Sequence, residues 1–328
     1  MKKRVVFRMI GSQVVGMGHI YRTLSLSEEL KSHELLFITD TASDLAISCF
    51  SSKEGWLGAF REEELTSQIL ASEPHMVILD VLDTDKDTVL VLKQNGVLVV
   101  SFEDLGSGSA HTTLTINELF DTPALAGHHY RWGRDYFFVR DEFLSVTPRL
   151  KPHIIRNLLL TFGGVDQHNL SQKILLQIRE LCYQHEIQVH IVTGPGYQGQ
   201  IELQNIVGEL AGINLTHATG VISKIMADAD LAISSNGRTV YELAHMNVPG
   251  IVIDQHSREG THHFARPENG FVNLGLYNPG VTERELLNTL SQLITDQGLH
   301  GALYDCTVQH TFTKESNPGI IEIKNLLM

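Results

Sequence analysis

The sequence predicts an α/β protein built from two parallel sheets. Short apolar runs rich in β-branched residues recur along the chain, and segments of helical length follow them, as after 5–10 and 76–80. Strands connected in this way form right-handed crossovers and therefore a parallel sheet. The pattern pauses at Pro148–Pro152 and then begins again. We therefore expect two units of the same architecture, residues 1–149 and 150–328.

Apolar runs, helix caps and Gly or Pro breaks define the elements expected in each unit. The strands expected in the first unit cover 5–10, 34–39, 76–80, 97–102, 114–117 and 136–139. Its helices begin at 19 and near 43, and cover 62–72 and 83–93. The strands expected in the second unit cover 157–162, 187–192, 213–216, 230–234 and 248–253. Its helices cover 169–183, 201–210, 221–227, 237–245 and 282–295, with a short final helix at 320–327.

Composition excludes several classes of protein. The 328 residues are 42% hydrophobic and 19% charged, which is typical of a soluble globular protein with a substantial core. No run approaches the length of a membrane span, and Arg8 interrupts the apolar stretch behind the basic residues 2–4, so we expect neither membrane insertion nor export. Cys49, Cys182 and Cys306 fit neither a disulfide framework nor a zinc site, which favours a reducing cytoplasm.

The net charge of −13 argues against a general nucleic-acid-binding protein, which needs a basic face. The electrostatic field of a chain with this net charge does not attract anions. An anionic ligand has to be bound by a local site, built from backbone N–H groups and a few Arg or Lys side chains.

The first candidate site follows the first expected strand, at the end where open α/β sheets bind ligands. Gly16 and Gly18 permit positive φ and close approach of the backbone to a ligand, and His19 lies at the start of the next helix. A helix amino terminus disfavours extra positive charge, so we expect His19 to stay neutral and able to act as a general base. Arg22 lies three residues further on, close to the same face. The alternative is that His19 only caps a helix after a Gly-rich turn.

The second candidate site lies in 230–243, where a buried strand ends in small polar residues before a helix. The backbone N–H groups of Gly237, Arg238 and Thr239, with the Thr239 hydroxyl, form a candidate anion site, and Arg238 adds charge for a diphosphate. Glu242 lies about one turn into the helix, where its carboxylate could accept hydrogen bonds from ribose hydroxyls. The alternative is a tight turn followed by a solvated Glu242.

Other motifs have simpler structural interpretations. The turn at Gly163 and Gly164 resembles the second candidate site, but Asp166 or Asn169 could simply cap a helix. The acidic residues in 83–85 resemble a metal-binding pair, but they open a helix, where Asp is a favoured cap. The histidines at 256, 262 and 263 match no standard zinc pattern, and we expect a mobile loop there. We expect neither a metal nor another cofactor.

Several segments match, in order and spacing, those of a known family. They are Gly16–His19 with Arg22, 102–106 with 116–117, 136–143, 162–166, and 237–243. On these segments the chain resembles the MurG-like branch of GT-B proteins. More narrowly, it resembles nucleotide-sugar hydrolases of pseudaminic acid biosynthesis and related spore-coat polysaccharide proteins. The resemblance implies two Rossmann-like, doubly wound domains that face each other across a cleft.

The resemblance also implies roles for individual residues. His19 matches the proposed base that activates water at the anomeric carbon of the sugar. The helix start at 237–239 matches the site of the diphosphate, and Glu242 matches the glutamate that holds the ribose. Gly163, Gly164 and Gln255 match loops that bind the substrate. The resemblance implies no metal, because backbone dipoles can carry the charge of the leaving group.

The chain departs from the hydrolase pattern at two places. Leu82 stands where the hydrolases have an aromatic residue, usually Tyr. The usual Asn-Gln before the last substrate loop is Asp254-Gln255, and an extended stretch follows at 257–264. Both departures lie where the sugar, not the nucleotide, would be recognised.

The leading hypothesis is hydrolysis of a nucleotide-linked sugar, UDP-linked in its simplest form, in nonulosonic acid or surface polysaccharide biosynthesis. The alternative is a GT-B glycosyltransferase that uses the same donor and an acceptor hydroxyl in place of water. A third, non-enzymatic hypothesis is a nucleotide-sugar sensor or a partner of a sugar-activating synthetase. The base, the sugar, the acceptor and the oligomeric state are not specified by the sequence.

Overall fold

The computed structural model describes residues 2–152 and 154–328 and divides the chain into two α/β units. Unit 1 consists of Met1–Arg140 and Thr313–Met328, and unit 2 consists of Asp141–Phe312. The chain therefore enters unit 2 once and returns to unit 1 for its last residues.

The division comes earlier than the expected one between residues 149 and 150. Helix α5 (Asp141–Leu144) follows the division, and Glu142 accepts a hydrogen bond from the backbone N–H of Ser223 at 3.1 Å. Arg149 pairs with the buried Asp230, with 2.5 Å between Nη2 and Oδ1. These contacts hold the segment before residue 150 against unit 2.

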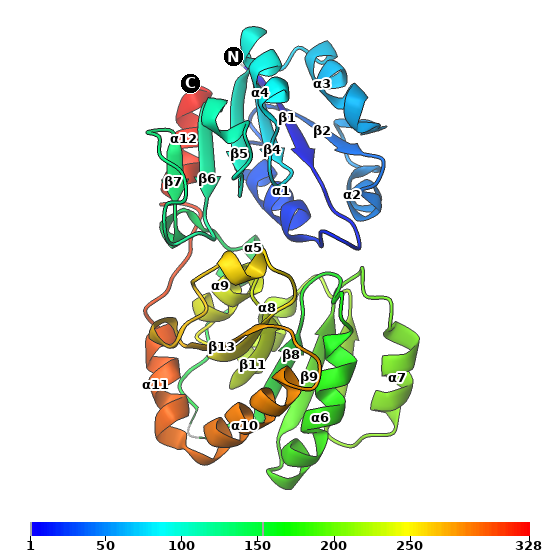
Figure 1. Ribbon diagram of the computed structural model, residues 1–328, viewed down its shortest axis with the longest axis vertical. Helices are drawn as coiled ribbons and strands as arrows, with labels where there is room; N and C mark the ends of the chain where they lie inside the picture. Colours follow the sequence, from blue (N-terminus) through cyan, green and yellow to red (C-terminus); the bar gives the residue numbers. More distant parts are fainter. Residues whose placement is uncertain (1, 153) are drawn as a thin grey trace. The chain divides into compact units, whose positions relative to one another are not determined.

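Unit 1 is built on a seven-stranded parallel sheet with the strand order β3-β2-β1-β4-β5-β6-β7 (Figure 1). Its strands are β1 (Arg4–Met9), β2 (Glu34–Asp40), β3 (Trp56–Phe60), β4 (Met76–Asp80), β5 (Leu98–Phe102), β6 (Leu114–Asn117) and β7 (Tyr130–Trp132). The central strands β1 and β4 are buried from Val5 to Met9 and from Met76 to Asp80. Burial on both faces explains why these strands are almost continuously apolar.

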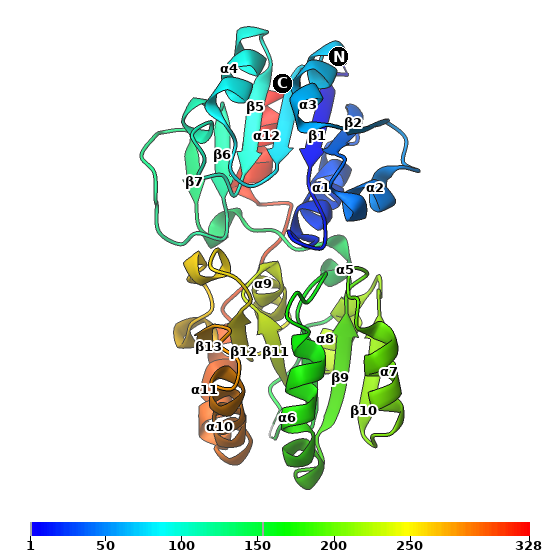
Figure 2. The same ribbon diagram turned by 45° about the vertical axis from the view of Figure 1, so that its right-hand side comes forward.

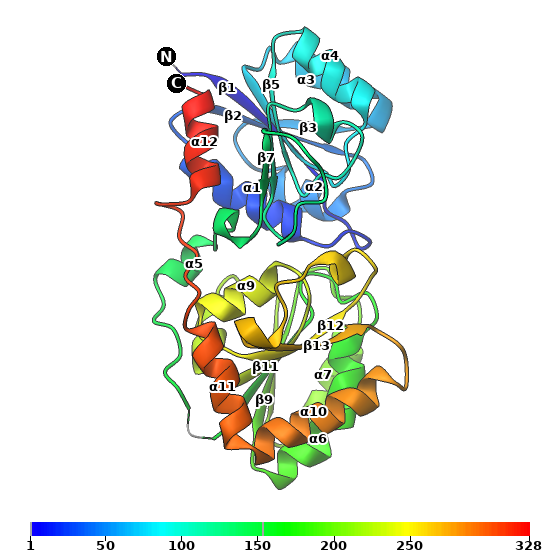
Figure 3. The same cartoon turned by 60° about the vertical axis from the view of Figure 1, so that its left-hand side comes forward.

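Helices cover both faces of this sheet. On one face lie α1 (Gly18–Glu29), α2 (Asp44–Phe50) and α12 (Pro318–Leu326), and on the other lie α3 (Glu62–Ala71) and α4 (Lys86–Gln94). Ile320 and Ile323 of α12 share a core with Phe7 of β1, so the last helix packs against the first strand. Asn317 caps α12 through the Ile320 N–H at 3.0 Å. The two ends of the chain lie close together at one end of unit 1 (Figure 2 and Figure 3).

Unit 2 repeats the architecture with a six-stranded parallel sheet in the order β10-β9-β8-β11-β12-β13. Its strands are β8 (Asn157–Thr161), β9 (Gln188–Thr193), β10 (Ile213–His217), β11 (Leu231–Ser235), β12 (Gly250–Asp254) and β13 (Phe271–Leu276). Asn157 to Thr161 pair with Gln188 to Val192, and Leu158 to Thr161 pair with Leu231 to Ser234. This register places β8 and β11 at the centre of the sheet.

The helices of unit 2 also lie on both faces of their sheet. Helices α6 (Leu170–Gln184), α7 (Gln200–Gly208) and α10 (Thr282–Thr295) share one core with the strands (Figure 2). Helix α8 (Ile222–Asp228) contacts β8, and α9 (Arg238–His245) contacts β11 and β12. Helix α11 (Gln297–Thr307) follows α10 and contacts the turn Pro267–Asn269. No helix in the described parts of the chain is both long and apolar enough to cross a membrane.

Most expected elements are confirmed, and the differences have physical reasons. Strands β3 and β13 and helix α11 were not expected. The two strands lie at sheet edges and are only partly buried, so they lack the buried apolar run that marks a central strand. The strand expected at 136–139 is wrong, and β7 pairs with β6 instead. Phe137, Phe138 and Val139 are apolar because they are buried in the core, not because they pair in the sheet. Helix α4 begins at Lys86 rather than 83 because Asp85 caps it through the Thr88 N–H at 2.8 Å.

Both sheets have the same topological switch point. Strand β1 lies between β2 and β4, and strand β8 lies between β9 and β11. Open α/β sheets bind ligands at the carboxyl ends of the strands beside such a switch point. The first and second candidate sites follow β1 and β11, so both lie at a switch point.

We predict that Asp230→Ala destabilises the protein by roughly 2–4 kcal/mol, because two backbone N–H groups and the Arg149 guanidinium lose a buried acceptor. Asp230 Oδ2 accepts hydrogen bonds from the N–H groups of Arg156 at 2.9 Å and Asn157 at 2.8 Å. Urea unfolding of the full chain measures the effect. The exposed Asp228→Ala is the matched control and should change the free energy of unfolding by less than about 0.5 kcal/mol. Equal stability of the two variants would contradict the prediction.

Candidate functional site

The loop after β1 brings His19 to the carboxyl end of the sheet in unit 1. Gly16 has a φ of 85°, and its N–H bonds the Ser12 carbonyl at 2.8 Å, which closes the loop. Gly18 is the first residue of α1 and is not among the residues with positive φ, so the expectation of left-handed freedom is confirmed for Gly16 only. His19 follows as the second residue of the helix and is buried.

The imidazole of His19 contacts the carboxylate of Asp80, the last residue of the neighbouring strand β4. The distance between Nδ1 and Oδ1 is 2.5 Å, and the strand register pairs Met9 with Asp80. A carboxylate only accepts hydrogen bonds, so Nδ1 carries the proton and Nε2 is the proton acceptor in the neutral ring. In the described chain Nε2 makes no hydrogen bond. Asp80 thus fixes the tautomer that a general base requires, and the catalytic role of His19 stays a prediction.

Arg22 lies one turn further along α1 and binds the same carboxylate. Its Nε lies 2.8 Å and its Nη2 2.5 Å from the two Asp80 oxygens, and its Nη1 lies 3.0 Å from Glu118 Oε1. Its guanidinium carbon also lies 4.8 Å from the centre of the Phe102 ring. The side chain is only 2% exposed. The direct contact of Arg22 with substrate stays a prediction, and the geometry supports a role in positioning Asp80.

Charge balance keeps Asp80 ionised. Burial by itself raises the pKa of a carboxyl group, but the Arg22 guanidinium and the His19 ring hold the pKa of Asp80 well below its usual range. Glu103 also lies near, at 3.8 Å from Arg22 Nη1. The Arg22 guanidinium thus forms ion pairs with three buried carboxylates, which follow or end β4, β5 and β6: Asp80, Glu103 and Glu118.

The acidic residues in 83–85 have a structural role. Asp104 accepts hydrogen bonds from the N–H and hydroxyl of Thr84 at 2.9 and 2.7 Å, and Asp83 accepts one from the Leu105 N–H at 3.0 Å. A Cβ on Gly106 would lie 2.3 Å from the Thr84 carbonyl oxygen, so glycine is required where the two turns meet. Among the residues that the structure describes, no group of three or more His, Cys, Asp or Glu side chains could hold a metal ion.

In unit 2, strand β11 leads through Asn236 and Gly237 into α9. Gly237 is the N-cap of α9 and has no side chain that could accept hydrogen bonds from the first N–H groups of the helix. Such N–H groups at a helix start can bind an anion. Arg238 and Thr239 open the helix and are half-buried. Glu242 is only 6% exposed, so the alternative of a solvated glutamate is wrong. Binding of a diphosphate and a ribose by these residues stays a prediction.

The glycine turn after β8 lies beside the end of β11. Gly163 has a φ of 75°, and a Cβ there would lie 3.9 Å from Ser235 Oγ. Gly164 accepts a hydrogen bond from the Gly196 N–H at 2.9 Å, which joins the turn to the loop after β9. Asp166 caps α6 through the N–H groups of Leu170 and Ser171 at 2.7 and 2.8 Å. The capping interpretation of Asp166 is therefore confirmed.

Gln255 connects the ends of β12 and β8. Its Nε2 donates to the Phe162 carbonyl at 3.2 Å, and its backbone N–H donates to Glu259 Oε2 at 2.6 Å. Its side-chain oxygen is buried and has no hydrogen-bond partner among the described residues. A buried oxygen without a partner carries a desolvation cost that a ligand donor would remove. The structure thus brings Gln255 to the same edge of the sheet as Gly163 and Gly237.

The loop with three histidines is held by Asn236 rather than by a metal. Asn236 Nδ2 donates to the backbone carbonyls of Glu259 and His262, both at 2.9 Å. His262 Nδ1 lies 2.8 Å from the Asn236 carbonyl oxygen and donates to it. Burial lowers the pKa of His262 to about 4, so its ring is neutral at pH 7. His256 Nδ1 accepts the Glu259 N–H at 3.3 Å.

Sequence reasoning did not find two of the site residues. Asp80 could have been assigned as the partner of His19, because it ends an apolar strand and a carboxylate there points to a ligand or a charge partner. Glu259 gave no signal, because an acidic residue in a polar loop is ordinary. Only the fold shows that Glu259 is buried beside Gly237.

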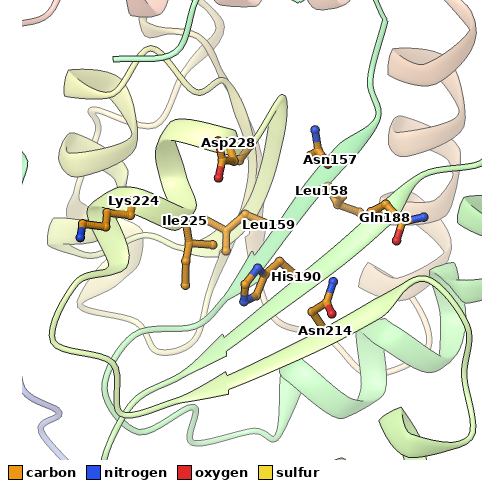
Figure 4. A pocket seen from close by; sticks show the side chains of 10 residues that line it. Asn157, Leu158, Leu159, Gln188, His190, Asn214, Lys224, Ile225 and Asp228 are labelled. Carbon is orange, nitrogen blue, oxygen red and sulfur yellow. The ribbon is translucent and has the colours of Figure 1, made fainter. Parts of the chain in front are cut away.

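A separate pocket of about 260 Å³ lies in unit 2 between the sheet and α8 (Figure 4). Asn157 of β8, His190 of β9 and Asn214 of β10 line one side, and Lys224 and Asp228 lie on the helix. None of the residues expected at the substrate site lines this pocket. The candidate substrate site is therefore distinct from it.

A family model and two relatives match the chain. Residues 158–296 match the glycosyltransferase family 28 C-terminal domain, which covers most of unit 2. The spore coat polysaccharide biosynthesis protein SpsG of Bacillus subtilis is 22% identical over 312 residues, which is 90% of each chain. The uncharacterized protein MJ1062 of Methanocaldococcus jannaschii is 26% identical over 264 residues. That match spans 75% of this chain but only 54% of the archaeal protein.

Three solved structures resemble the whole chain. Acinetobacter baumannii MurG has a TM-score of 0.66 at 14% identity and covers 98% of this chain and 99% of its own. The S. aureus MnaA structure with UDP has a TM-score of 0.62 at 15% identity, over 100% and 96%. The spinosyn rhamnosyltransferase SpnG with thymidine diphosphate has a TM-score of 0.60 at 12% identity, over 100% of both chains. The chain therefore has the fold of these structures, two Rossmann-like domains that are each built on a parallel sheet, as in GT-B enzymes.

Proposed function

We propose that this protein transfers a glycosyl group from a UDP-linked sugar, with His19 as the general base. The observation that carries the proposal is the His19–Asp80 pair at the carboxyl end of the sheet, with Nε2 left as the proton acceptor. The family 28 match over unit 2 supports a nucleotide-sugar donor. The UDP in the MnaA structure supports the choice of nucleotide.

In the proposed reaction, an acceptor oxygen attacks the anomeric carbon while Nε2 of His19 takes its proton. The bond between the anomeric carbon and the diphosphate oxygen breaks, and the electron pair leaves with the nucleoside diphosphate. Asp80 stabilises the imidazolium that forms, and Arg22 keeps Asp80 ionised and oriented. The backbone N–H groups at the start of α9 would stabilise the charge of the leaving group.

The nucleotide would be bound by unit 2. Gly237, Arg238 and Thr239 would bind the diphosphate, and Glu242 would accept hydrogen bonds from the ribose hydroxyls. Gly163, Gly164 and Gln255 lie at the same edge of the sheet and would complete the site. The unpartnered Gln255 oxygen supports this assignment, because a hydroxyl of the ligand would satisfy it.

The acceptor is either water or a hydroxyl group. Water would make the protein a nucleotide-sugar hydrolase in nonulosonic acid or polysaccharide biosynthesis. A hydroxyl would make it a glycosyltransferase, and two observations favour this second candidate: the family 28 match and Leu82 in place of an aromatic residue.

We predict that His19→Ala lowers kcat by roughly 10²–10⁴, the usual contribution of a general base, and leaves UDP affinity within about threefold. Asp80→Asn should also lower kcat with little effect on affinity, because it removes the charge that stabilises the imidazolium. Steady-state kinetics and calorimetry with UDP separate the two quantities. The exposed His128→Ala and Asp87→Asn are matched controls and should behave as the wild type. Unchanged kcat in His19→Ala would remove the base from the proposal.

For Glu242→Ala we predict an effect on UDP affinity, in contrast to the effect on kcat that is expected for His19→Ala. The variant should bind UDP more weakly by roughly 1–3 kcal/mol, because the ribose hydroxyls lose a buried acceptor. Calorimetry of UDP binding checks this, with 2′-deoxyuridine diphosphate as a second ligand. The variant should discriminate less between the two ligands than the wild type does. If Glu242→Ala binds UDP normally, the ribose site lies elsewhere.

Incubation with UDP-sugars alone distinguishes the two acceptors. A hydrolase should release UDP and free sugar without any added acceptor, at a rate that His19→Ala abolishes. A glycosyltransferase should leave the donor intact until a glycan or lipid-linked acceptor is added. Binding of the donor without turnover under any condition would favour the non-enzymatic hypothesis of a nucleotide-sugar sensor.

A further inference from the structure

Glu259 is a buried carboxyl group at the edge of the sheet where the diphosphate site is proposed. It lies in the loop after β12, at the start of the short 3₁₀ turn Glu259–Thr261, and is only 7% exposed. Its Oε2 accepts the Gln255 N–H at 2.6 Å. Its Oε1 would lie 3.7 Å from a Cβ built on Gly237, the N-cap of α9. A carboxyl oxygen therefore lies beside the first turn of the helix.

Two structural features hold Glu259 in this place. The backbone carbonyl of Glu259 accepts a hydrogen bond from Asn236, the residue before Gly237. The carboxyl group itself accepts the hydrogen bond from the Gln255 N–H, and its Oε1 would be in ordinary van der Waals contact with a Cβ at Gly237. The loop after β12 and the turn before α9 thus pack against each other.

An ionised carboxylate at this position would repel a diphosphate. Two negative groups a few ångströms apart in a partly buried site cannot both stay ionised without a large cost. A carboxylic acid in the same place has the opposite effect, because its O–H donates a hydrogen bond to a phosphate oxygen. The second oxygen can keep the Gln255 N–H in either state.

Building on the proposed function, we propose that Glu259 is a further ligand-binding residue: in its acid form it donates a hydrogen bond to the diphosphate at the start of α9. Binding of the nucleotide above neutral pH then takes up one proton. The loop after β12 would in this way contribute to binding of the nucleotide as well as to recognition of the sugar.

The surroundings of Glu259 support this proposal. Burial raises the pKa of Glu259 to about 7, and the neighbouring carboxylate of Asp254 acts in the same direction. The N–H groups of Gln255 and Asn236 oppose the shift but do not cancel it. The free protein therefore holds a mixture of acid and carboxylate at neutral pH. A bound diphosphate would favour the acid.

Two histidines in the same loop do not change charge above pH 7. Burial lowers the pKa of His262 to about 4 and also lowers that of His256, so both rings are neutral there. Arg258 in the same loop and Arg238 on α9 stay protonated. His168, from the loop after β8, contacts the Gln255 carbonyl through Nε2 at 2.8 Å.

The test is calorimetry of UDP binding to the full chain at pH 7, 8 and 9. The terminal phosphate of UDP has a pKa of about 6 and is ionised throughout this range. If only the acid form of Glu259 binds, the Kd of the wild type should rise on the order of 50-fold from pH 7 to pH 9. Titrations at pH 8 in buffers with different heats of ionisation should show uptake of close to one proton for each UDP bound.

Glu259→Gln keeps a hydrogen-bond donor and cannot ionise, so its Kd should be nearly constant over this range and lower than that of the wild type at pH 9. The exposed Glu268→Gln is the matched control and should retain the pH dependence of the wild type. Circular dichroism checks that the variants are folded. Proton uptake by the wild type tests the proposal without any variant.

The outcomes separate this proposal from the proposed function. UDP binding that is equally tight at pH 7 and pH 9 without proton uptake overturns the role of Glu259 and leaves the nucleotide site intact. Loss of UDP binding in folded Glu259→Gln at every pH also overturns it. No UDP binding by the wild type at any pH overturns both the nucleotide site and the role of Glu259.

Discussion

The carboxylate of Asp80 is the interaction on which the first unit's site depends. It ends a fully buried strand, the guanidinium of Arg22 compensates its charge, and the ring of His19 donates a hydrogen bond to it. A buried carboxylate without such partners would be costly, so the arrangement of α1 against β4 is fixed by charge as well as by packing. The same contact that satisfies Asp80 also orients the histidine. The Asp80 carboxylate is therefore important both for the packing of α1 against the sheet and for the orientation of His19.

Unit 2 presents polar groups at the carboxyl edge of its sheet in a different way. The N-cap of α9 is Gly237, which has no side chain, so the first backbone N–H groups of the helix receive no hydrogen bond from a capping side chain. Gln255 and Glu259, in the loop after β12, lie at the same edge of the sheet. The two units thus place different polar groups at the carboxyl ends of their strands, an imidazole in unit 1 and a helix start in unit 2.

Asn236 holds the loop after β12 against the start of α9 through the carbonyls of Glu259 and His262, which are 23 and 26 positions away. The neutral ring of His262 donates a further hydrogen bond to the Asn236 carbonyl. Hydrogen bonds between distant segments therefore fix the position of this loop.

The sequence by itself determined the fold class, the central strands and the loops that carry His19 and Gly237. These features depend on local patterns, because a strand buried on both faces must be apolar and a sharp turn requires glycine. Tertiary structure alone decided the partner of His19, the burial of Glu242 and Glu259, and the edge strands β3, β7 and β13. Asp80 lies 61 positions from His19, and which strands are neighbours is set by the topology of the whole sheet. Local patterns predict the secondary structure and the burial of a single segment. The packing of distant segments determines which charged groups contact each other and which are removed from water.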